Sequence, residues 1–330
     1  MIKVSIIIIN YNYSKYLAES IDSALNQTYA NVEVIVVDDG SKDNSSDIIK
    51  SYGDDIEAVF QENRGMIEAS NAGFNLATGN IILFLDADDY LYEDAAEKVI
   101  SSWEDGTSKV HFRLQKINAK GEHIGTNPAN KYLLSSGDVS KLILRTGTYV
   151  TPPTSGNAYS KKVLDNIFPI KIDKIGRNDS YFDRIPTDAY LKFRIPFYGE
   201  IKSIQDTCGV YRIHGENQGA SKSPYKNKYK RQRILKQSLI NTEFIKKQCI
   251  DKEISHNKDI LFYDSSLLKL RILSYSKDSD LHLWPDDNKR KLFKLTLLSF
   301  NNSDQYRNHK KIFDMIYMIT MIAFIKKRSS

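Results

Sequence analysis

Short apolar runs alternate with amphipathic stretches over the first hundred residues. Four runs rich in Ile and Val have the length of buried strands: Val4–Ile9, Val32–Val37, Ala58–Phe60 and Ile81–Leu85. Between them, apolar residues recur at helical spacing in three segments: Tyr16–Gln27, Asn44–Tyr52 and Met66–Leu76. Parallel strands need a crossover connection, which a helix usually supplies. The pattern therefore predicts an α/β fold, with a mostly parallel sheet covered by helices on both faces.

Beyond the fourth run the pattern is less regular, and from about Ser223 it becomes almost entirely helical. In the middle of the chain we expect a helix over Tyr92–Trp103, a hairpin that turns at Asn118–Gly121, and a helix over Asp188–Arg194. The residues after Ser223 are rich in Lys and short of Gly and Pro, which favours helices. The predicted organisation is a first domain over 1–222, divided at about residue 105 into two parts, and a helical C-terminal region over 223–330.

The net charge of +6 at neutral pH conceals two regions of opposite sign. Residues 221–330 hold 24 Lys and Arg against 11 Asp and Glu, a net charge of +13, whereas residues 1–220 carry −7. An acidic front half suits a site that attracts a metal cation. A basic rear half suits an anionic membrane surface or a nucleic acid, although basic helices are also common as solvated surfaces without a partner.

Cysteine usage and the N-terminus favour a reducing cytoplasm. Cys208 and Cys249 are the two cysteines and lie far apart in sequence, so a disulfide scaffold is not expected. The apolar run Val4–Ile9 has the length of a strand, and no small-residue cleavage site follows it. We therefore do not interpret it as a signal peptide.

Polar residues directly follow the first two predicted strands. Asn10–Tyr13 follows the first strand and Asp38–Ser41 the second. In open α/β sheets, ligands bind in the crevice at the carboxyl ends of the strands. The dinucleotide fingerprint G-x-G-x-x-G is absent here, whereas a tyrosine ring can stack on a base and a carboxylate can accept an imide N–H or a ribose hydroxyl. Alternatively, Asn10–Tyr13 is only a polar turn, and Ser41 and Asp43 only cap the next helix.

Three carboxylates follow the fourth predicted strand. Asp86, Asp88 and Asp89 come directly after the apolar run Ile81–Leu85. Clustered carboxylates repel one another unless a cation lies between them, and Mg²⁺ or Mn²⁺ commonly bridges carboxylates to a diphosphate. A D-x-D pattern by itself also arises from surface acids. Its position at the end of a buried strand favours a metal site.

A further motif, Tyr211-Arg212-Ile213-His214-Gly215, comes after a late predicted strand. Arg212 and His214 precede a glycine turn, where both can face a diphosphate or a metal ion. A lone histidine is often structural, so the ligand role is a hypothesis.

Taken in order, these segments resemble the family 2 glycosyltransferases, which are inverting enzymes with the GT-A fold. The resemblance covers about residues 1–220 and rests on these segments: Ser5–Asn12, Val36–Ser41, Asn63–Gly65 with Asn71–Gly73, Phe84–Asp89 and Tyr211–Gly215. It implies that Asp39 recognises the base, with Asp38 close by, and that Asp86 and Asp88 serve the ribose and the metal. How Asp86, Asp88 and Asp89 divide these tasks is left open.

The site residues follow from the motifs and the resemblance together. The predicted nucleotide-binding residues are Ile9, Asn10, Tyr11, Asp38, Asp39, Asn71, Asp86 and Ala87. Asp88 and His214 are predicted to bind Mn²⁺ or Mg²⁺, and Arg212 is predicted to contact the diphosphate.

The resemblance also implies a catalytic base late in the first domain, in an acidic pair that opens a helix. The matching segment here is Thr187–Leu191, which lacks the first acid, so the assignment rests on Asp188. The helix dipole would favour the ionised form of such a carboxylate, as a base requires. Asp179 and Asp183 are the alternatives. Ser70 is another departure, because many relatives have Arg at this position, and a phosphate contact from it is therefore in doubt.

Together, the motifs and the resemblance imply inverting transfer of a sugar from a nucleotide-sugar, first of all a UDP-sugar, to an acceptor hydroxyl during synthesis of a bacterial-type surface glycan. The donor half of the first domain would be at about 1–105 and the acceptor half at about 106–222. A carboxylate base activates the acceptor, and a cation stabilises the departing diphosphate. A sugar nucleotidyltransferase is one alternative, but it would have a Gly-rich loop with Arg and Lys after the first strand. A non-catalytic module that binds membrane or nucleic acid is another, and the retained acids argue against it. We expect no nucleic acid partner.

The run Met315–Ile325 contains no charged residue and has eleven positions. It is shorter than the roughly 20 apolar residues of a spanning helix. Lys310–Lys311 and Lys326–Arg328 flank it, so the run is either a helix on an anionic membrane surface or a core helix. Many relatives extend lipid-linked glycans. By resemblance, we expect a cytoplasmic enzyme on the inner face of the cell membrane, with a glycan or lipid-linked glycan as acceptor.

Overall fold

The computed structural model describes residues 1–171, 186–215, 223–251, 253–254, 259–278, 280–302 and 308–325, and the side chains of 308–310 are not described. The chain forms two compact units. The first comprises Met1–Asp138 and Val150–Asn217, and the second comprises Val139–Tyr149 and Gln218–Ser330. A short segment from the predicted acceptor half therefore belongs to the second unit.

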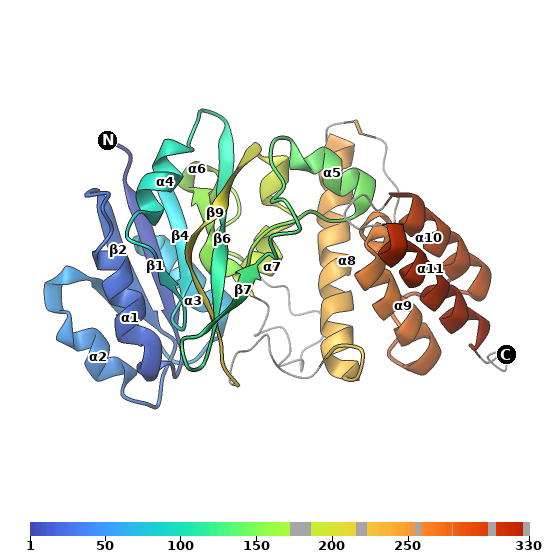
Figure 1. Cartoon of the computed structure of the whole chain (residues 1–330), viewed down its shortest axis with the longest axis horizontal. Helices are drawn as coiled ribbons and strands as arrows, with labels where there is room; N and C mark the ends of the chain where they lie inside the picture. Colours follow the sequence, from blue (N-terminus) through green and yellow to red (C-terminus); the bar gives the residue numbers. More distant parts are fainter. Residues whose placement is uncertain are drawn as a thin grey trace. The chain divides into compact units, whose positions relative to one another are not determined.

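The first unit is built on one mixed sheet (Figure 1). Its strands are β1 (Val4–Asn10), β2 (Val32–Asp38), β3 (Glu57–Phe60), β4 (Ile81–Asp86), β5 (Tyr90–Leu91), β6 (Thr107–Asn118), β7 (His123–Asn127), β8 (Asn157–Ser160) and β9 (Glu200–Ile213). Their order is β3-β2-β1-β4-β8-β6-β9-β5, and β7 pairs with β6. The first four strands in this order are parallel, as the alternation of strands and helices predicts. Beyond β4 most pairs are antiparallel, so the sheet as a whole is mixed rather than mostly parallel.

Helices cover both faces of this sheet, as predicted. They are α1 (Ser14–Leu25), α2 (Ser45–Ser51), α3 (Met66–Leu76), α4 (Ala95–Ser101), α6 (Lys161–Leu164) and α7 (Thr187–Leu191), with the 3₁₀ turns η1 (Gly53–Asp55), η2 (Thr154–Gly156) and η4 (Ile195–Phe197). Alternate residues of β1 serve opposite faces, because side chains in a strand alternate. Ile6 and Ile8 pack in one core with residues of α1, α2 and α4, whereas Ile7 packs in the other with residues of α3, α6 and α7.

Some elements differ from the sequence prediction. The strand β8 was not predicted, since only Ala158 and Tyr159 of its four residues are apolar. The apolar pattern predicts separate strands at Ile201–Ile204 and Gly209–Tyr211. In the structure they form one strand, β9, whose register against β6 shifts along its length. The helix α7 ends at Leu191 rather than Arg194, and Pro196 lies within η4.

The second unit is helical in its described residues. It contains α5 (Val139–Thr146), α8 (Lys228–Asp251), the 3₁₀ turn η6 (Ile260–Tyr263), α9 (Ser265–Lys277), α10 (Lys289–Asn302) and α11 (Asn308–Ala323). Its core includes a fully buried arginine, Arg271, whose guanidinium lies 2.6 Å from Asp259 and 2.6 Å from Asp287. The ring centroids of Phe262 and Trp284 lie 4.6 Å and 4.4 Å from the guanidinium. Removing one partner would leave a buried charge unpaired, which is strongly destabilising.

The apolar run in α11 packs in a core on one side and is exposed on the other. Met318, Ile322 and Ile325 are buried in the core of the second unit. Asp314 is also buried, and it accepts hydrogen bonds from Ser265 and Lys269 of α9. Large apolar side chains on the other side of the helix are exposed. Among the described residues, no helix combines the length and the apolar character needed to cross a bilayer.

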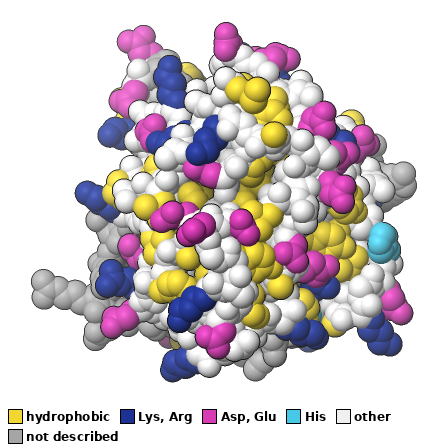
Figure 2. Space-filling model, turned by 90° about the vertical axis from the view of Figure 1, so that its left-hand side faces the viewer, with side chains coloured by type: hydrophobic (Ala, Val, Ile, Leu, Met, Phe, Trp, Pro, Cys, Tyr) yellow, Lys and Arg dark blue, Asp and Glu magenta, His cyan; other side chains and the backbone are white. Residues whose placement is uncertain are grey.

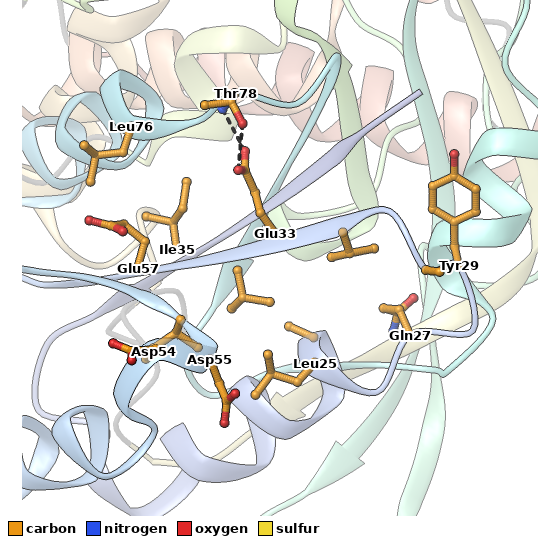
Figure 3. Close-up of a pocket in the computed structure, with 15 residues that line it drawn as sticks. Leu25, Gln27, Tyr29, Glu33, Ile35, Asp54, Asp55, Glu57, Leu76 and Thr78 are labelled. Atoms are coloured by element: carbon orange, nitrogen blue, oxygen red, sulfur yellow. Dashed lines mark hydrogen bonds between the residues drawn. The ribbon is translucent and has the colours of Figure 1, made fainter. Parts of the chain in front are cut away.

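A pocket lies at the amino end of β2, away from the edge where the candidate site residues gather (Figure 3). Leu25, Leu76 and Ile35 contribute apolar lining, and acids including Glu33 and Glu57 lie among them. Viewed from the left-hand side of Figure 1, acidic and basic side chains lie around a band of hydrophobic side chains (Figure 2). The pocket is lined by β2 as far as Ile35, which lies about 10 Å along the strand from Asp38.

Glu33 of β2 forms hydrogen bonds with residues at the amino ends of β1 and β4. Its carboxylate accepts hydrogen bonds from Ser5 Oγ and from the backbone N–H groups of Thr78 and Gly79, and it forms an ion pair with Lys3 at 2.5 Å. Although partial burial acts to raise the pKa of Glu33, the hydrogen bonds from Lys3, Ser5 and Thr78 lower it to about 2. The ionised form is therefore the one that the fold stabilises.

We predict that Glu33→Gln lowers the free energy of unfolding at pH 7 and that the difference from wild type shrinks as the pH falls. The ordinary pKa of 4.5 exceeds the folded pKa of about 2, so the stabilisation is complete above pH 4.5 and is lost as the pH falls through 2. Urea unfolding at several pH values measures this. Glu57→Gln, at an exposed acid of β3, is the control, and an equal pH dependence in both variants would contradict the prediction.

Candidate active site

The register of the parallel strands brings four predicted site residues together. Asn10 at the end of β1 pairs with Asp38 of β2, and Ile9 of β1 pairs with Asp86 of β4. The three strands therefore end side by side, and the polar residues that follow them share one edge of the sheet. This edge is where open α/β sheets bind ligands.

Asn10 and Asp38 are joined by hydrogen bonds beneath the loop that follows β2. Asn10 Nδ2 donates to Asp38 Oδ1 at 2.7 Å, and Ser41 donates to Asp38 through its backbone N–H and its hydroxyl. Both Asn10 and Asp38 are buried. Asn10 Oδ1 is buried without a hydrogen-bond partner among the described residues. A buried amide oxygen without a partner is costly, so it is a candidate acceptor for a ligand or a water molecule.

Asp39 is buried and organises the loop between β3 and α3. Its Oδ1 accepts from Gln61 Nε2 at 2.7 Å and from Arg64 N at 2.9 Å, and its Oδ2 accepts from Gly65 N at 2.8 Å. Gly40 beside it has φ +74°, and a Cβ there would lie 2.6 Å from Asn63 N. This position therefore requires glycine, both for its backbone conformation and for the close approach of the loop.

The acid cluster after β4 is crowded. Burial, followed by the charge of Asp88, raises the pKa of both Asp86 and Asp89 well above the ordinary range. Ser155 of η2 donates its hydroxyl to Asp89 Oδ2 at 2.6 Å and accepts from Asp86 N at 3.2 Å. Ala87 is buried between the acids. The cluster is thus held by a loop from another part of the sequence, around residues 154–156.

His214 is adjacent to Asp88, whereas Arg212 is bound to protein groups. His214 Nε2 lies 2.9 Å from Asp88 Oδ2, and both side chains are buried. The guanidinium of Arg212 donates to the carbonyl of Asp88 at 3.1 Å and forms an ion pair with Glu19 of α1. The backbone N–H of Arg212 donates to Asp89 Oδ1 at 3.0 Å. Arg212 thus holds the turn that carries the acids.

Tyrosine rings surround this pair of motif residues. The rings of Tyr13 and Tyr16 lie 5.7 Å and 5.0 Å from that of His214, measured between centroids. The guanidinium of Arg212 lies 4.7 Å from the ring of Tyr16. The polar segment after β1 therefore packs on the late motif, which is 200 residues away in sequence.

Asp188 lies in the electrostatic field of the acid cluster. Its charge contributes to the raised pKa of Asp86. Burial raises the pKa of Asp188 itself, while the N–H of Ala189, at 2.7 Å from Oδ1, and the charges of Lys192 and Lys109 act to lower it. The short helix α7 does not keep this pKa low, since burial outweighs the local donors. Asp179 and Asp183 lie outside the described residues.

Two residues of α3 hold the surroundings of Asp188. Ser70, where many relatives have Arg, is within 2.6 Å of the Thr187 hydroxyl and thereby links α3 to α7. Asn71 makes two hydrogen bonds to the backbone of Ile170, through Nδ2 at 3.0 Å and Oδ1 at 2.8 Å. The predicted nucleotide contact from Asn71 would come from a side chain that already bonds the fold.

Sequence reasoning missed Ser155 and Glu19, and nothing in the pattern of single residues marks them. Ser70 was named only as a departure from the relatives, and its bond to Thr187 was not predicted. Of the remaining predicted residues, Tyr11 is 36% exposed beyond the end of β1, and Ile9 is partly buried against the core that includes α3. The structure gathers the predicted residues of β1, β2, β4 and the late motif at one edge.

Comparisons with known proteins agree with this architecture. Residues 5–168 match the family described as Glycosyl transferase family 2. An uncharacterized glycosyltransferase of Nostoc sp. is 38% identical over 222 residues, which cover 65% of this chain and 66% of the relative. Chondroitin synthase of Escherichia coli is 29% identical over 229 residues, which cover 66% of this chain and 30% of the relative. The chain thus spans slightly less than two thirds of the first relative and less than a third of the second.

Solved structures share the fold over almost the whole chain. Residues 1–349 of S. aureus TarS, in complex with UDP-GlcNAc, give a TM-score of 0.55 at 15% identity and cover 97% of this chain and 90% of that chain. The mannosyltransferase PcManGT from Pyrobaculum calidifontis, in complex with GDP-Man and Mn²⁺, gives a TM-score of 0.51 at 16% identity. The match covers 98% of this chain and 86% of that chain. At these identities the likeness concerns the fold alone. The predicted fold class is confirmed: a GT-A-like α/β domain is followed by a helical region.

We predict that Ser155→Ala destabilises the first unit by about 1–3 kcal/mol, because Asp89 and the N–H of Asp86 lose a hydrogen-bond partner in a buried site. Thermal unfolding measures the loss. Ser101→Ala removes a hydroxyl that bonds Glu97 within α4, and it should change stability by less than about 0.5 kcal/mol. Equal effects of the two substitutions would show that Ser155 does not hold the acid cluster.

Proposed function

We propose that this chain, which belongs to glycosyl transferase family 2 through residues 5–168, transfers a sugar from a nucleotide-sugar donor to an acceptor hydroxyl with inversion. The observation that carries the proposal is the convergence of Asn10, Asp38 and Asp86 at one sheet edge, with Asp188 in the same electrostatic cluster. We propose a UDP-sugar as donor, by analogy with the TarS complex, although PcManGT binds GDP-Man.

The nucleotide would lie across the ends of β1 and β2. Tyr11 is exposed there and offers a ring for stacking on the base. Asp39 offers carboxylate oxygens, each of which can accept more than one hydrogen bond, and Asn10 Oδ1 is an acceptor without a partner in the described chain. We propose Asp86 for the ribose. Ile9 and Ala87 supply backbone beside these groups. Asn71 would contribute to nucleotide binding only indirectly, because its side chain holds the backbone of Ile170.

The chemistry of the acid cluster fits a divalent cation. Carboxylates that raise one another's pKa are stabilised when a positive charge lies among them, and oxygen and imidazole ligands suit Mn²⁺. Within the described chain, no group of at least three His, Cys, Asp or Glu side chains is arranged to hold a metal alone. We therefore propose that Asp88 and His214 hold the ion together with donor diphosphate oxygens. The bound ion would neutralise charge that develops on the leaving diphosphate.

Arg212 receives a different role from the one its motif predicts. Its guanidinium already bonds Glu19 and the carbonyl of Asp88. We propose that it positions Asp88 rather than contacting the diphosphate directly.

Asp188 is the proposed base. In an inverting displacement the acceptor hydroxyl attacks the anomeric carbon opposite the leaving nucleotide, and its proton passes to a carboxylate as the new bond forms. A raised pKa brings Asp188 closer to neutral pH, which makes it a stronger base once ionised. Ser70 and Thr187 fix the helix that carries it. The acceptor is proposed to be a glycan, free or lipid-linked, in surface-polysaccharide synthesis.

We predict that Asp88→Ala abolishes transfer and weakens Mn²⁺ binding while the protein stays folded. A panel of nucleotide-sugars, followed by metal-dependent nucleotide release, tests the activity, and calorimetry with Mn²⁺ and UDP tests the binding. Asp94→Asn, at an exposed acid paired with Lys98, is the matched control and should behave as wild type. Full turnover in excess chelator would exclude metal dependence.

We predict that Asp188→Asn slows transfer by at least about 100-fold with little change in donor affinity, because a base acts on the acceptor. Transfer rates and donor binding are measured separately. The acid limb of the wild-type pH profile should lie above the ordinary Asp range, since activity needs the ionised form of a group whose pKa is raised. Asp165→Asn, at an exposed residue, is the control. Normal transfer by the variant would redirect the assignment to Asp183 or Asp179.

A further inference from the structure

One side of α11 exposes a row of large apolar side chains. We call it the outer face, and it consists of Ile312, Phe313, Ile316 and Tyr317 of the helix and Phe324 directly after it. Their exposed fractions are 44%, 69%, 55%, 45% and 82%. Charged residues normally occupy the solvent side of a surface helix, whereas here the described positions between Lys311 and Ile325 include only one charge, Asp314. Large exposed apolar patches mark interaction sites.

The orientation of the helix is fixed, so the outer face cannot turn inward. Asp314 and Met318 are buried on the opposite side, and Lys269 of α9 lies 2.5 Å from Asp314. Rotating α11 would separate this buried ion pair and expose Met318, Ile322 and Ile325. The exposure of the outer face is therefore a property of the packed second unit.

The neighbouring helix α10 adds positive charge and further apolar surface. Lys289 Nζ lies 3.5 Å from the carbonyl of Ala323, which brings the start of α10 to the end of α11. Phe293 and Leu297 of α10 are 42% and 40% exposed. Arg290, which precedes them, and Lys294, which lies between them, are also exposed. The described residues of α10 and α11 include one acid, Asp314, which is buried. Their exposed charges are therefore all positive.

We propose that the outer face of α11 lies in the headgroup region of an anionic lipid bilayer, with the basic residues of α10 beside it. Apolar side chains next to Lys and Arg, on helices whose described residues expose no acid, are the pattern of helices that bind such surfaces. The exposed acid Asp286, which precedes α10, is paired with Lys291. A second copy of this chain is a poorer occupant, because two basic surfaces would face each other. The proposal concerns attachment and does not depend on the transfer chemistry.

Co-sedimentation with vesicles tests the proposal on the full chain. The expected result is reversible binding to phosphatidylcholine vesicles that contain phosphatidylglycerol, weaker binding in high salt, and little binding to phosphatidylcholine alone. The triple variant Phe313→Ser, Ile316→Gln, Phe324→Ser should lower the partition coefficient by at least about tenfold, because three apolar side chains no longer enter the interface. These residues are exposed, so the melting temperature should remain close to wild type.

The matched control is Ile250→Gln on α8, where an apolar residue is 68% exposed outside the outer face, and it should bind vesicles as wild type does. The double variant Arg290→Gln, Lys294→Gln should weaken binding to anionic vesicles and reduce its salt dependence.

Three results would overturn the proposal: absence of vesicle binding, binding that is equally strong with and without anionic lipid, or an equal loss of binding in the Ile250 control. Self-association that disappears in the triple variant, without vesicle binding, would assign the outer face to a second copy. Binding is measured without donor, so its failure leaves the proposed transfer reaction unaffected.

Discussion

The register that aligns β1 with β2 and β4 is the constraint on which the site depends. Parallel strands in register end together, so the last residues of the strands lie side by side at one edge of the sheet. Here those residues are Asn10, Asp38 and Asp86. Burial and mutual repulsion raise the pKa of Asp86 and Asp89, so the folded structure disfavours the charged form of these acids. A cation bound among such acids would lower the free energy of the site, because it relieves their repulsion.

The same carboxylates also hold the loops around the site. Asp38 bonds the turn at Ser41, Asp39 bonds the backbone of Arg64 and Gly65, and Asp89 bonds Ser155. Each of these bonds joins segments that are distant or that turn sharply. Replacing such an acid therefore removes a structural bond as well as a chemical group, and loss of activity alone cannot separate the two. Asp188 is a better probe, because its carboxylate bonds the N–H of the next residue, Ala189, rather than a distant segment, and its proposed role concerns the acceptor.

A strand can be predicted from the sequence when its apolar run is long and uninterrupted, and not when it is short. The strands β1, β2 and β4 are uninterrupted apolar runs, and both faces of the sheet follow from alternation along them. The strand β8 has only two apolar residues, and its place between β4 and β6 arises from pairing rather than from its own pattern. The motif around Arg212 identifies a residue type that suits a diphosphate, but its partner Glu19 is a surface-type acid on α1 that no motif marks. Contacts of this kind depend on the three-dimensional approach of segments, which local pattern does not encode.

The apolar run in α11 shows why hydrophobicity alone does not distinguish a core helix from a membrane-surface helix. Such a run supplies apolar side chains on every side, so it satisfies a core and an interface equally well. What separates the two is the single charge at its start, since Asp314 can be buried only against a partner, and Lys269 and Ser265 supply one on α9. This bond selects the inner side of the helix and leaves Phe313, Ile316 and Phe324 on the other. A polar anchor thus converts a uniformly apolar segment into one with a defined core face and a defined exposed face, and the exposed face is then available to a lipid surface.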